Sequence, residues 1–493
     1  MKKRLIVPIF LAAMALPLCI HQMPSGVSAD FIGEYSSSGD SDKFGKEVNK
    51  EIADEGFVLL KNDGSLPLDE GAWVSIVGKS STNLSRGGGG SGSGRVNGES
   101  YDLQKSMTEA GFEINDTATN FFKNAKGGRT NGNGGWKGNS DVTIGETPID
   151  EITKNQDLLD SLDEYSDAIL QVITREGSEG CDVKMCNATD DTKTNSGDKI
   201  LSERHALELS KNEQDLFEEL HNHTDHIIII INSSNVFECD IFENDPQVSG
   251  VLWIGNPGDV GPRAVGRILS GQVNPSGRTV DTWGRDFTKD PTFQNFSDNA
   301  QTNRTTNANG DEIYAAADTM FTADGYPVLS YGTDKDYRSH SSPRWADQKN
   351  KVVQGGINGV KPSAYVAYEE GIYVDYRYYE TRYADMAKED AKAAKEWYDS
   401  DEGVVYPFGY GLSYTTFDQK IVRINPANGS TLDEETDLIE VSVKVTNTGS
   451  VAGKDAVQLY WKAPYTAGGI EKADHVLCAF DKSKLLEPGE SQD

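Results

Sequence analysis

Hydrophobic residues in the first part of the chain are gathered into short runs with little polar interruption. The clearest is 227–231, which consists of five consecutive isoleucines. Runs of the same kind lie at 57–60, 73–78, 168–173 and 248–253. Strands that are apolar throughout are typical of a parallel sheet with both faces covered by helices.

Segments with the spacing of amphipathic helices alternate with these runs. They lie at 43–55, 101–112, 203–223 and 261–269. Strand, loop and helix recurring in this order predict an α/β sandwich with a largely parallel sheet. Functional loops in such a fold lie beyond the carboxyl ends of the strands. The residues that follow 168–173 occupy such a place.

The pattern changes near the end of the chain. Val441, Val443 and Val445 alternate with polar residues, which predicts a half-buried antiparallel strand. Two further strands are predicted at 457–461 and 476–480. They indicate the start of an all-β sandwich, a fold that needs roughly seven strands. We therefore expect the sandwich to be cut short at Asp493.

These changes of pattern set the expected organisation. A polar stretch with little periodicity separates the α/β part from the aromatic-rich segment that follows it. We expect a signal peptide over 1–29, an α/β sandwich over 40–284, an inserted loop-rich region over 285–371, a return to the sandwich over 372–417 and a partial β-sandwich over 418–493.

The N-terminus has the composition of a secretory signal peptide. Lys2, Lys3 and Arg4 precede the apolar stretch 5–20, and small residues lead to a cleavage site after Ala29. The apolar stretch is too short for a membrane span, and no later stretch is long enough for one. We therefore expect a secreted or extracytoplasmic protein without a membrane span.

Charge and cysteine content narrow the expected partners. Lys+Arg number 47 and Asp+Glu 78, which gives a formal net charge of -31. Such a surface repels nucleic acid and anionic lipid, so we expect neither as a partner. Cys181 and Cys186 are close enough in sequence to pair locally, and no histidine lies at ligand spacing beside them. We expect no metal and no cofactor.

Three stretches resemble the C-terminal α/β domain of glycoside hydrolase family 3, in the order in which that family has them. They are 55–62, then 255–258 together with 271–278, and finally 406–417. The last resembles the family's junction into its fibronectin type III-like domain. The resemblance therefore implies an α/β sandwich followed by an incomplete fibronectin type III-like sandwich, and a β-glucosidase-like activity.

The same resemblance implies that a catalytic barrel is missing. Family members usually begin with the barrel, whereas the sandwich here follows the signal peptide. The segments 290–293 and 373–379 resemble a bacterial subset in which the barrel comes last. The chain contains neither the Ser-Asp-Trp of the family's nucleophilic aspartate nor its Lys-His-Phe substrate-binding motif. We therefore expect a fragment whose barrel followed Asp493 and which is inactive without it.

The resemblance also implies where one of the reacting groups lies. A retaining glycosidase needs a nucleophilic carboxylate and, about 5–5.5 Å from it, a carboxyl group that acts first as an acid and then as a base. In family 3 the sandwich domain supplies the second group from a loop at a strand end. Glu179 matches this position, although Ser178 and Cys181 replace the usual Gly and a common Tyr. Spacing alone also allows a solvated loop carboxylate.

Other residues near this loop are further candidates. Glu176 is the alternative acid/base, Arg175 is an ion-pair partner or a substrate-binding residue, and Arg86 is a second candidate for substrate binding. The Gly-rich segment 87–94 is either a loop near the sugar or a plain flexible loop, and it lacks the Gly-Lys-Ser/Thr ending of a phosphate-binding loop. The Tyr-rich run 373–383 either stacks on sugar rings or, as we favour, packs inside the fold.

Together these features predict a retaining, β-glucosidase-type hydrolase of terminal β-linked sugars. The expected partners are an oligosaccharide or aryl β-glycoside substrate and the missing barrel domain. The alternative is a stand-alone carbohydrate-binding or scaffolding module without catalytic activity. A coding sequence that continues into a barrel favours the enzyme, and one that stops after Asp493 favours the module.

Overall fold

The computed structural model describes most of the chain. Its residues are 35, 37–88, 98–129, 144–177, 207–290, 370–426, 438–466 and 468–493, with the backbone of the short strands β8 (Arg304–Thr306), β9 (Glu312–Tyr314), β10 (Val352–Val353) and β11 (Gly356–Ile357). β8 pairs with β9, and β10 with β11, both antiparallel. The chain divides into the units 1–47 and 48–493, and helix α2 (Ser38–Gly56) crosses this boundary.

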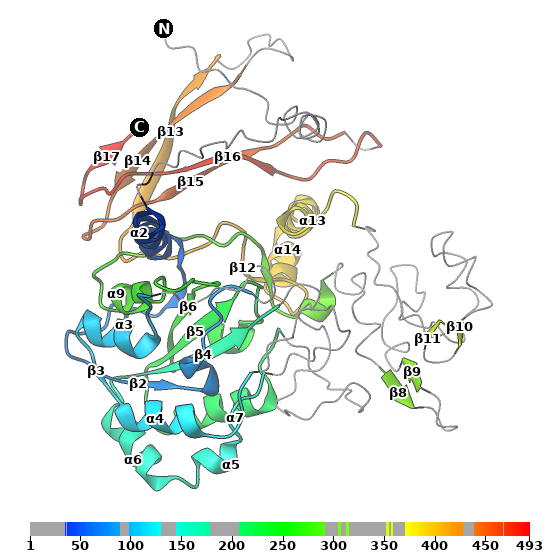
Figure 1. Ribbon diagram of the computed structural model, residues 1–493. Helices are drawn as coiled ribbons and strands as arrows, with labels where there is room; N and C mark the ends of the chain where they lie inside the picture. The colour runs from blue at the N-terminus through cyan, green and yellow to red at the C-terminus, as the bar shows by residue number, and fades with distance from the viewer. Residues whose placement is uncertain are drawn as a thin grey trace, which may run out of the picture. The chain divides into compact units, whose positions relative to one another are not determined.

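A six-stranded sheet forms the centre of the second unit (Figure 1). Its strands run in the order β1 (Val58–Asn62), β6 (Val248–Trp253), β5 (Ile227–Ser233), β4 (Ala168–Arg175), β2 (Trp73–Val77) and β3 (Glu113–Ile114). All neighbouring strands are parallel except β1 and β6. On the other side of β1, the Leu412 N–H donates to the carbonyl oxygen of Leu59 at 2.8 Å. The predicted, largely parallel sheet is confirmed.

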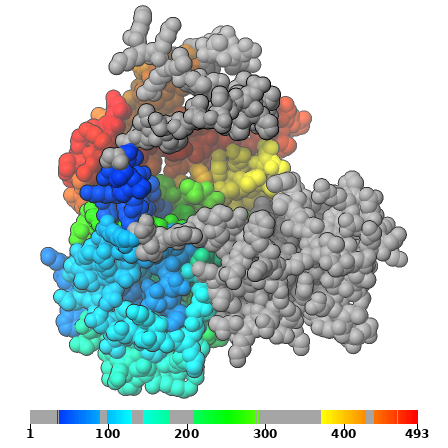
Figure 2. All heavy atoms as spheres, viewed as in Figure 1, coloured from blue at the N-terminus to red at the C-terminus, as the bar shows by residue number. Residues whose placement is uncertain are grey.

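Helices cover both faces of this sheet, which explains the apolar runs. One face packs against α4 (Asp116–Asn124), α6 (Gln156–Glu164) and α7 (Lys211–Leu220). The other packs against α3 (Leu103–Ala110), α9 (Arg263–Leu269) and Ala53 of α2. The isoleucines of β5 alternate between these two cores, and all of them are fully buried. In Figure 2 the layer that contains α4 and α6, in cyan, is closely packed at the foot of the view.

The helix predicted over 203–223 is wrong at its start. Within the described residues α7 begins at Lys211, because Ser210 caps it. The Ser210 hydroxyl accepts from the Glu213 N–H at 3.2 Å, and the Glu213 carboxylate accepts from the Ser210 N–H at 2.9 Å. This reciprocal capping box fixes the first turn. Leu207 is buried but lies before the helix.

Two helices follow the sheet in the chain. α13 (Tyr376–Glu389) and α14 (Ala391–Tyr398) pack around Tyr379, Trp397 and Val404. β12 (Val404–Tyr406) pairs with β7 (Trp283–Gly284). Tyr376 and Tyr379 are buried, so this part of the Tyr-rich run packs inside the fold, as we favoured.

Small antiparallel sheets complete the described fold. One consists of β13 (Phe417–Asn425), β14 (Glu440–Asn447) and β17 (Ser491–Gln492), and the other of β15 (Ala456–Trp461) and β16 (Val476–Lys482). The predicted fold class, an α/β sandwich followed by an all-β part, is confirmed. The domain boundaries given above stay predictions. Within the described ranges no helix is long and apolar enough to span a bilayer.

Candidate functional site

Strand β4 ends at the carboxyl edge of the sheet, where the sequence predicts the acid/base loop. Every residue of β4 is buried, so neighbouring strands and helices hold its end in place. Glu176 and Gly177 follow directly. Glu179 lies in 178–206, outside the described residues, and its role as acid/base therefore stays a prediction. The described residues define the end of β4, which precedes that segment in the sequence.

Arg175, the last residue of β4, is held in a buried ion pair. Its guanidinium donates to both carboxylate oxygens of Glu213, at 2.8 Å from Nη1 to Oε1 and 2.6 Å from Nη2 to Oε2. The two side chains are only 3% and 1% exposed. Nη2 also donates to the carbonyl oxygen of Glu208 at 2.7 Å. A bidentate pair of this kind is strong and directional. Arg175 is thus an ion-pair partner, while its contact with a substrate stays a prediction.

Glu176 lies beside Arg129, a residue from the loop that follows α4. Arg129 Nη2 and Glu176 Oε2 are 2.8 Å apart, and the side chains are 4% and 5% exposed. Burial lowers the pKa of Arg129, although the negative charge of Glu176 opposes this shift. Arg129 Nη1 also donates to the carbonyl oxygen of Asn83 at 3.0 Å. Glu176 is therefore engaged in an ion pair that ties the end of β4 to two other loops.

Arg86, the other predicted substrate-binding residue, lies in the loop after β2. Its Nη1 donates to the carbonyl oxygen of Asp259 at 2.9 Å, and its Nη2 to that of Tyr101 at 2.8 Å. The guanidinium thus joins the loop after β2 to the loop after β6. A Cβ on Gly88 would lie 3.4 Å from the carbonyl oxygen of Gly177. The Arg86 loop therefore passes beside the residues that follow β4, and residues 89–97 lie outside the described part of the chain.

Asn232, which sequence analysis missed, connects these loops. It lies near the end of β5 and is 0% exposed. Its Nδ2 donates to the carbonyl oxygens of Ser85 at 2.8 Å and Gly255 at 2.6 Å. Its Oδ1 accepts from the Ser85 N–H at 2.6 Å and the Thr174 hydroxyl at 3.2 Å. A polar residue directly after five isoleucines, at the carboxyl end of a strand, is the signal that could have found it.

Glu146 fixes the base of the loop that carries Arg129. It is 2% exposed, and both of its carboxylate oxygens lie 2.9 Å from the Lys79 N–H. Gly78 lets this carboxylate approach, because its φ is +91° and a Cβ there would lie 3.2 Å from Glu146 Oε2. The Gly128 N–H donates to the carbonyl oxygen of Gly145 at 2.8 Å. These contacts hold Gly128 and Gly145 together, at the two ends of the segment 129–144.

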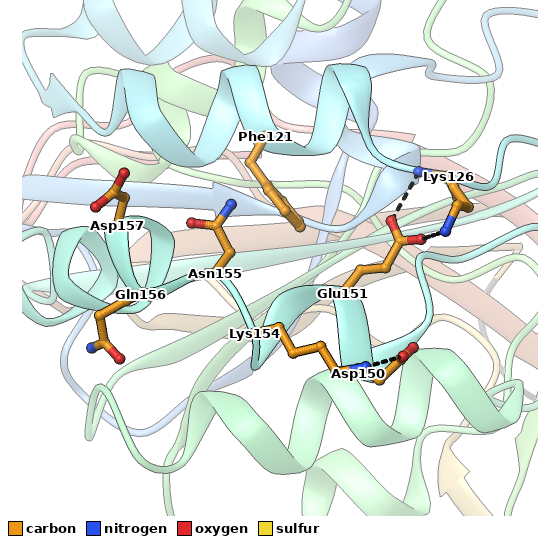
Figure 3. A pocket seen from close by; sticks show the side chains of 8 residues that line it. All are labelled: Phe121, Lys126, Asp150, Glu151, Lys154, Asn155, Gln156 and Asp157. Atoms are coloured by element: carbon orange, nitrogen blue, oxygen red, sulfur yellow. Dashed lines mark hydrogen bonds and ion pairs between the residues drawn. The ribbon is translucent and has the colours of Figure 1, made fainter.

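A surface hollow of about 670 Å³ lies between the end of α4 and the start of α6 (Figure 3). Within it Lys126 pairs with Glu151, and Lys154 pairs with Asp150 at 2.6 Å. The charged groups therefore neutralise one another, and exposed pairs of this kind contribute little. None of the predicted site residues lines this hollow, and we assign it no function.

In the part of the chain that the structure describes, no group of three or more His, Cys, Asp or Glu side chains is placed to hold a metal ion. Cys239 and Cys478 are free thiols, and burial raises the pKa of Cys239 well above its usual value. Cys181 and Cys186 lie outside the described residues, so their pairing stays open.

Comparison with known proteins places most of the chain in one family. The glycosyl hydrolase family 3 C-terminal domain matches residues 57–376. Beta-glucosidase A of Butyrivibrio fibrisolvens is 29% identical over 465 residues, which are 90% of this chain and 45% of that protein. A beta-glucosidase of Ruminococcus albus is 26% identical over 448 residues, which are 90% of this chain and 35% of that protein. The chain therefore spans less than half the length of these two relatives.

Solved structures share the fold. Beta-glucosidase 3B from Thermotoga neapolitana, in complex with glucose, aligns with a TM-score of 0.58 and 24% identity over 93% of this chain and 49% of that one. A beta-glucosidase from Paenibacillus barengoltzii aligns with a TM-score of 0.58 and 24% identity, over 91% of this chain and 37% of that one. At this level of identity the likeness concerns the fold.

Proposed function

This chain belongs to glycosyl hydrolase family 3, and on that premise we propose that it supplies the acid/base half of a retaining β-glycosidase. The substrate class is an oligosaccharide or aryl glycoside with a terminal β-O-glycosidic bond, with glucose as the first sugar to test. The nucleophilic aspartate belongs to a barrel domain that is not in this chain. The chain alone is then catalytically inactive.

Glu179 is the acid/base in this proposal. In the first step its protonated carboxyl group gives a proton to the leaving oxygen while the barrel carboxylate attacks the anomeric carbon. In the second step the ionised Glu179 takes a proton from water, which attacks the same carbon and releases the nucleophile. No cofactor takes part, because both steps need only carboxyl groups and water.

The observation that carries the proposal is the end of strand β4. The buried strand, the Arg175–Glu213 pair and Asn232 together fix Thr174 and Arg175 at the end of β4, four residues before Glu179 in the sequence. The nearest alternative, Glu176, is already engaged by Arg129 and is 5% exposed. A group that must reach a glycosidic oxygen needs an open carboxyl, so the buried Glu176 is the poorer candidate.

Export is part of the same proposal. The basic start, apolar stretch and small residues before Asp30 favour a signal peptide that is cleaved after Ala29. N-terminal sequencing of the protein recovered outside the cytoplasm tests this directly. A mature protein that still begins at Met1 would contradict it.

The catalytic proposal is tested by complementation. The chain would be combined with the part of Beta-glucosidase A from Butyrivibrio fibrisolvens that it does not match. We expect no release of p-nitrophenol from p-nitrophenyl β-D-glucopyranoside by the chain alone, and turnover by the combined halves. In the combined enzyme Glu179→Gln is expected to lower turnover of cellobiose, which has a poor leaving group, by about 10²–10⁴-fold.

Azide separates the acid/base role from misfolding. With an activated aryl glucoside, added azide should restore turnover of Glu179→Gln and give β-glucosyl azide, because azide needs no general base to attack. The matched variant Glu176→Gln should not show this rescue. Unchanged turnover in Glu179→Gln would remove it from the role, and rescue of Glu176→Gln would transfer the role to Glu176. Turnover by the chain alone would contradict its dependence on a barrel.

A further inference from the structure

A groove lies between helices α13 and α14 and the strands β13, β15 and β16, well separated in sequence from the β4 loop. Its walls include Tyr376, Phe408, Tyr460, His475, Glu380 and Gln458, and its volume is about 490 Å³. We call it the aromatic groove. Small-molecule sites are mostly apolar or aromatic clefts of roughly 300–1,000 Å³ with a few placed polar groups. Figure 1 shows α13 and α14 beside β15 and β16.

The aromatic rings of the groove lie at different angles to one another. Tyr376 and Phe408 have centroids 4.6 Å apart and planes inclined by 32°. Tyr460 stands edge-on to Tyr376, with centroids 6.1 Å apart, and edge-on to His475, at 5.0 Å. The rings thus pack against one another, with Tyr376 buried behind the partly exposed Phe408, Tyr460 and His475.

Hydrogen bonds hold these side chains in place. The Tyr376 hydroxyl accepts from the Leu477 N–H at 2.9 Å, which joins α13 to β16. The Tyr460 hydroxyl donates to Gln458 Oε1 at 2.6 Å, and Gln458 Nε2 donates to the Gly409 carbonyl oxygen at 2.9 Å. Gly409 has a φ of +78°, and a Cβ there would collide with Gln458. The wall is therefore set before any ligand binds, which reduces the entropy lost on binding.

Polar atoms remain available on the same wall. Glu380 Oε1 accepts from the Tyr398 hydroxyl at 2.8 Å, and His475 Nδ1 lies 3.0 Å from Asp474 Oδ2. Among the described residues, Glu380 Oε2 and His475 Nε2 make no hydrogen bond. Burial, with Tyr376 and Glu380 close by, raises the pKa of Tyr460 to about 12, so its hydroxyl stays neutral.

We propose that the aromatic groove is a second, non-catalytic sugar site that binds a neutral disaccharide. The C–H faces of pyranose rings pack on aromatic rings, here the partly exposed Phe408 and Tyr460, and the sugar hydroxyl groups match Glu380 and His475. A net charge of -31 disfavours anionic ligands. This inference does not depend on the catalytic proposal, because it needs neither Glu179 nor a barrel.

The test is isothermal titration of the chain with cellobiose. We expect saturable binding that Tyr460→Ala weakens about tenfold, because an aromatic contact is lost. The matched control is Trp461→Ala. Trp461 is the next residue of β15, is 56% exposed and does not line the groove, so its loss should leave binding unchanged. Glu380→Gln, which keeps the size of the side chain, should weaken binding by a smaller factor.

Each outcome decides the proposal. If Tyr460→Ala loses its cooperative thermal transition, Glu380→Gln and Tyr460→Phe provide the readout, with weaker binding expected for the first and retained ring stacking for the second. No saturable heat with cellobiose overturns the proposal, as does equal weakening by Trp461→Ala.

Aromatic rings and a carboxylate also suit an organic cation, so tetramethylammonium is titrated as a second probe. Saturation by this cation without saturation by cellobiose also overturns it. Retained turnover by the combined halves with no cellobiose binding by the chain separates failure here from failure of the catalytic proposal.

Discussion

The six-stranded sheet and the β13–β14 pair use similar residues in opposite environments. All seven residues of β5 are buried, including its isoleucines. In β13, by contrast, Ile421 is 53% exposed and Ile424 is 43% exposed. β-branched residues suit both places because strand backbones favour them. Only in the sheet do helices on two faces remove them from water. In this protein, therefore, the preference of a residue for strand backbone and its burial in the core contribute separately to stability.

The two regions nevertheless share one device, a buried asparagine that joins loops. Asn447 in β14 is 0% exposed, like Asn232 in β5. Its Nδ2 donates to the carbonyl oxygens of Val451 at 2.8 Å and Leu486 at 2.9 Å, and its Oδ1 accepts from the Thr415 hydroxyl at 2.8 Å. An amide side chain can donate and accept at once, so it links loops to one another and to the neighbouring strands.

The largest expected effect compares two arginine–glutamate pairs. Arg175→Met leaves the Glu213 charge buried and should lower the free energy of unfolding by about 3–5 kcal/mol. Arg423 pairs with Glu440 on the surface, with side chains 57% and 59% exposed, and Arg423→Met should cost less than about 1 kcal/mol. Urea unfolding measures both.

A double variant checks the cause of the larger loss. Arg175→Met combined with Glu213→Gln removes both charges but keeps an acceptor for the capping of α7. It should recover much of the stability lost in Arg175→Met alone. Equal losses of unfolding free energy for Arg175→Met and Arg423→Met would show that an arginine–glutamate pair contributes equally to stability in the two regions.

The next largest expected effect compares a buried isoleucine of β5 with a partly exposed isoleucine of β13. Ile229→Ala removes a fully buried side chain and should lower the free energy of unfolding by about 2–5 kcal/mol. Ile421→Ala makes the same chemical change on β13, where about half of the side chain is already in water, and should stay within about 0.5 kcal/mol. Chemical unfolding followed by fluorescence and circular dichroism gives both values. A loss above 2 kcal/mol for Ile421→Ala would mean that another part of the protein covers β13.

The smallest effect is a pH dependence in the β15–β16 region. Burial raises the pKa of Asp474, but the hydrogen bond from His475 and the pairing with Lys462 outweigh it and lower the pKa below the usual 3.8. Because the pKa is depressed in the folded state, the stabilisation is present above pH 3.8 and is lost as the pH falls through the folded-state value.

The measurement for this prediction is unfolding as a function of pH. The difference in stability between the native chain and Asp474→Asn should be constant, at about 1 kcal/mol or less, near neutral pH. It should shrink below pH 3.8. A difference that grows on acidification would reverse the sign assigned here.

The strands of the sheet could be predicted because their composition leaves few alternatives. Five isoleucines in succession suit only a strand that is covered on both faces, and β5 is such a strand. The start of α7 could not be predicted from periodicity, because Ser210 stops the helix by capping it. Helices α4 and α6 were missed because each has only nine residues and they flank a Gly/Asn-rich stretch, although Phe122, Leu158 and Leu162 mark their buried faces.

The candidate site was predicted in part. Arg175, Glu176 and Arg86 do gather at one edge of the sheet, since parallel strands bring their carboxyl ends together. Their partners could not be predicted, because Glu213, Arg129 and Asp259 come from distant segments of the chain. Asn232 was missed for the same reason, since its function as a link depends on two loops and strand β4 meeting in space.

Strand β1 has a consequence for the time at which the fold can form. It has been synthesised once residue 62 has been made, but its partner β6 is complete only at residue 253, and Leu412 follows much later. At about 5–20 residues per second, the wait exceeds about 10 s. During synthesis the apolar first strand is therefore a nascent segment without its final neighbours. The pairs of the sheet become possible in the order β2–β3, β2–β4, β4–β5 and then β5–β6 with β6–β1, from one edge to the other, so the strand that is made first is paired last.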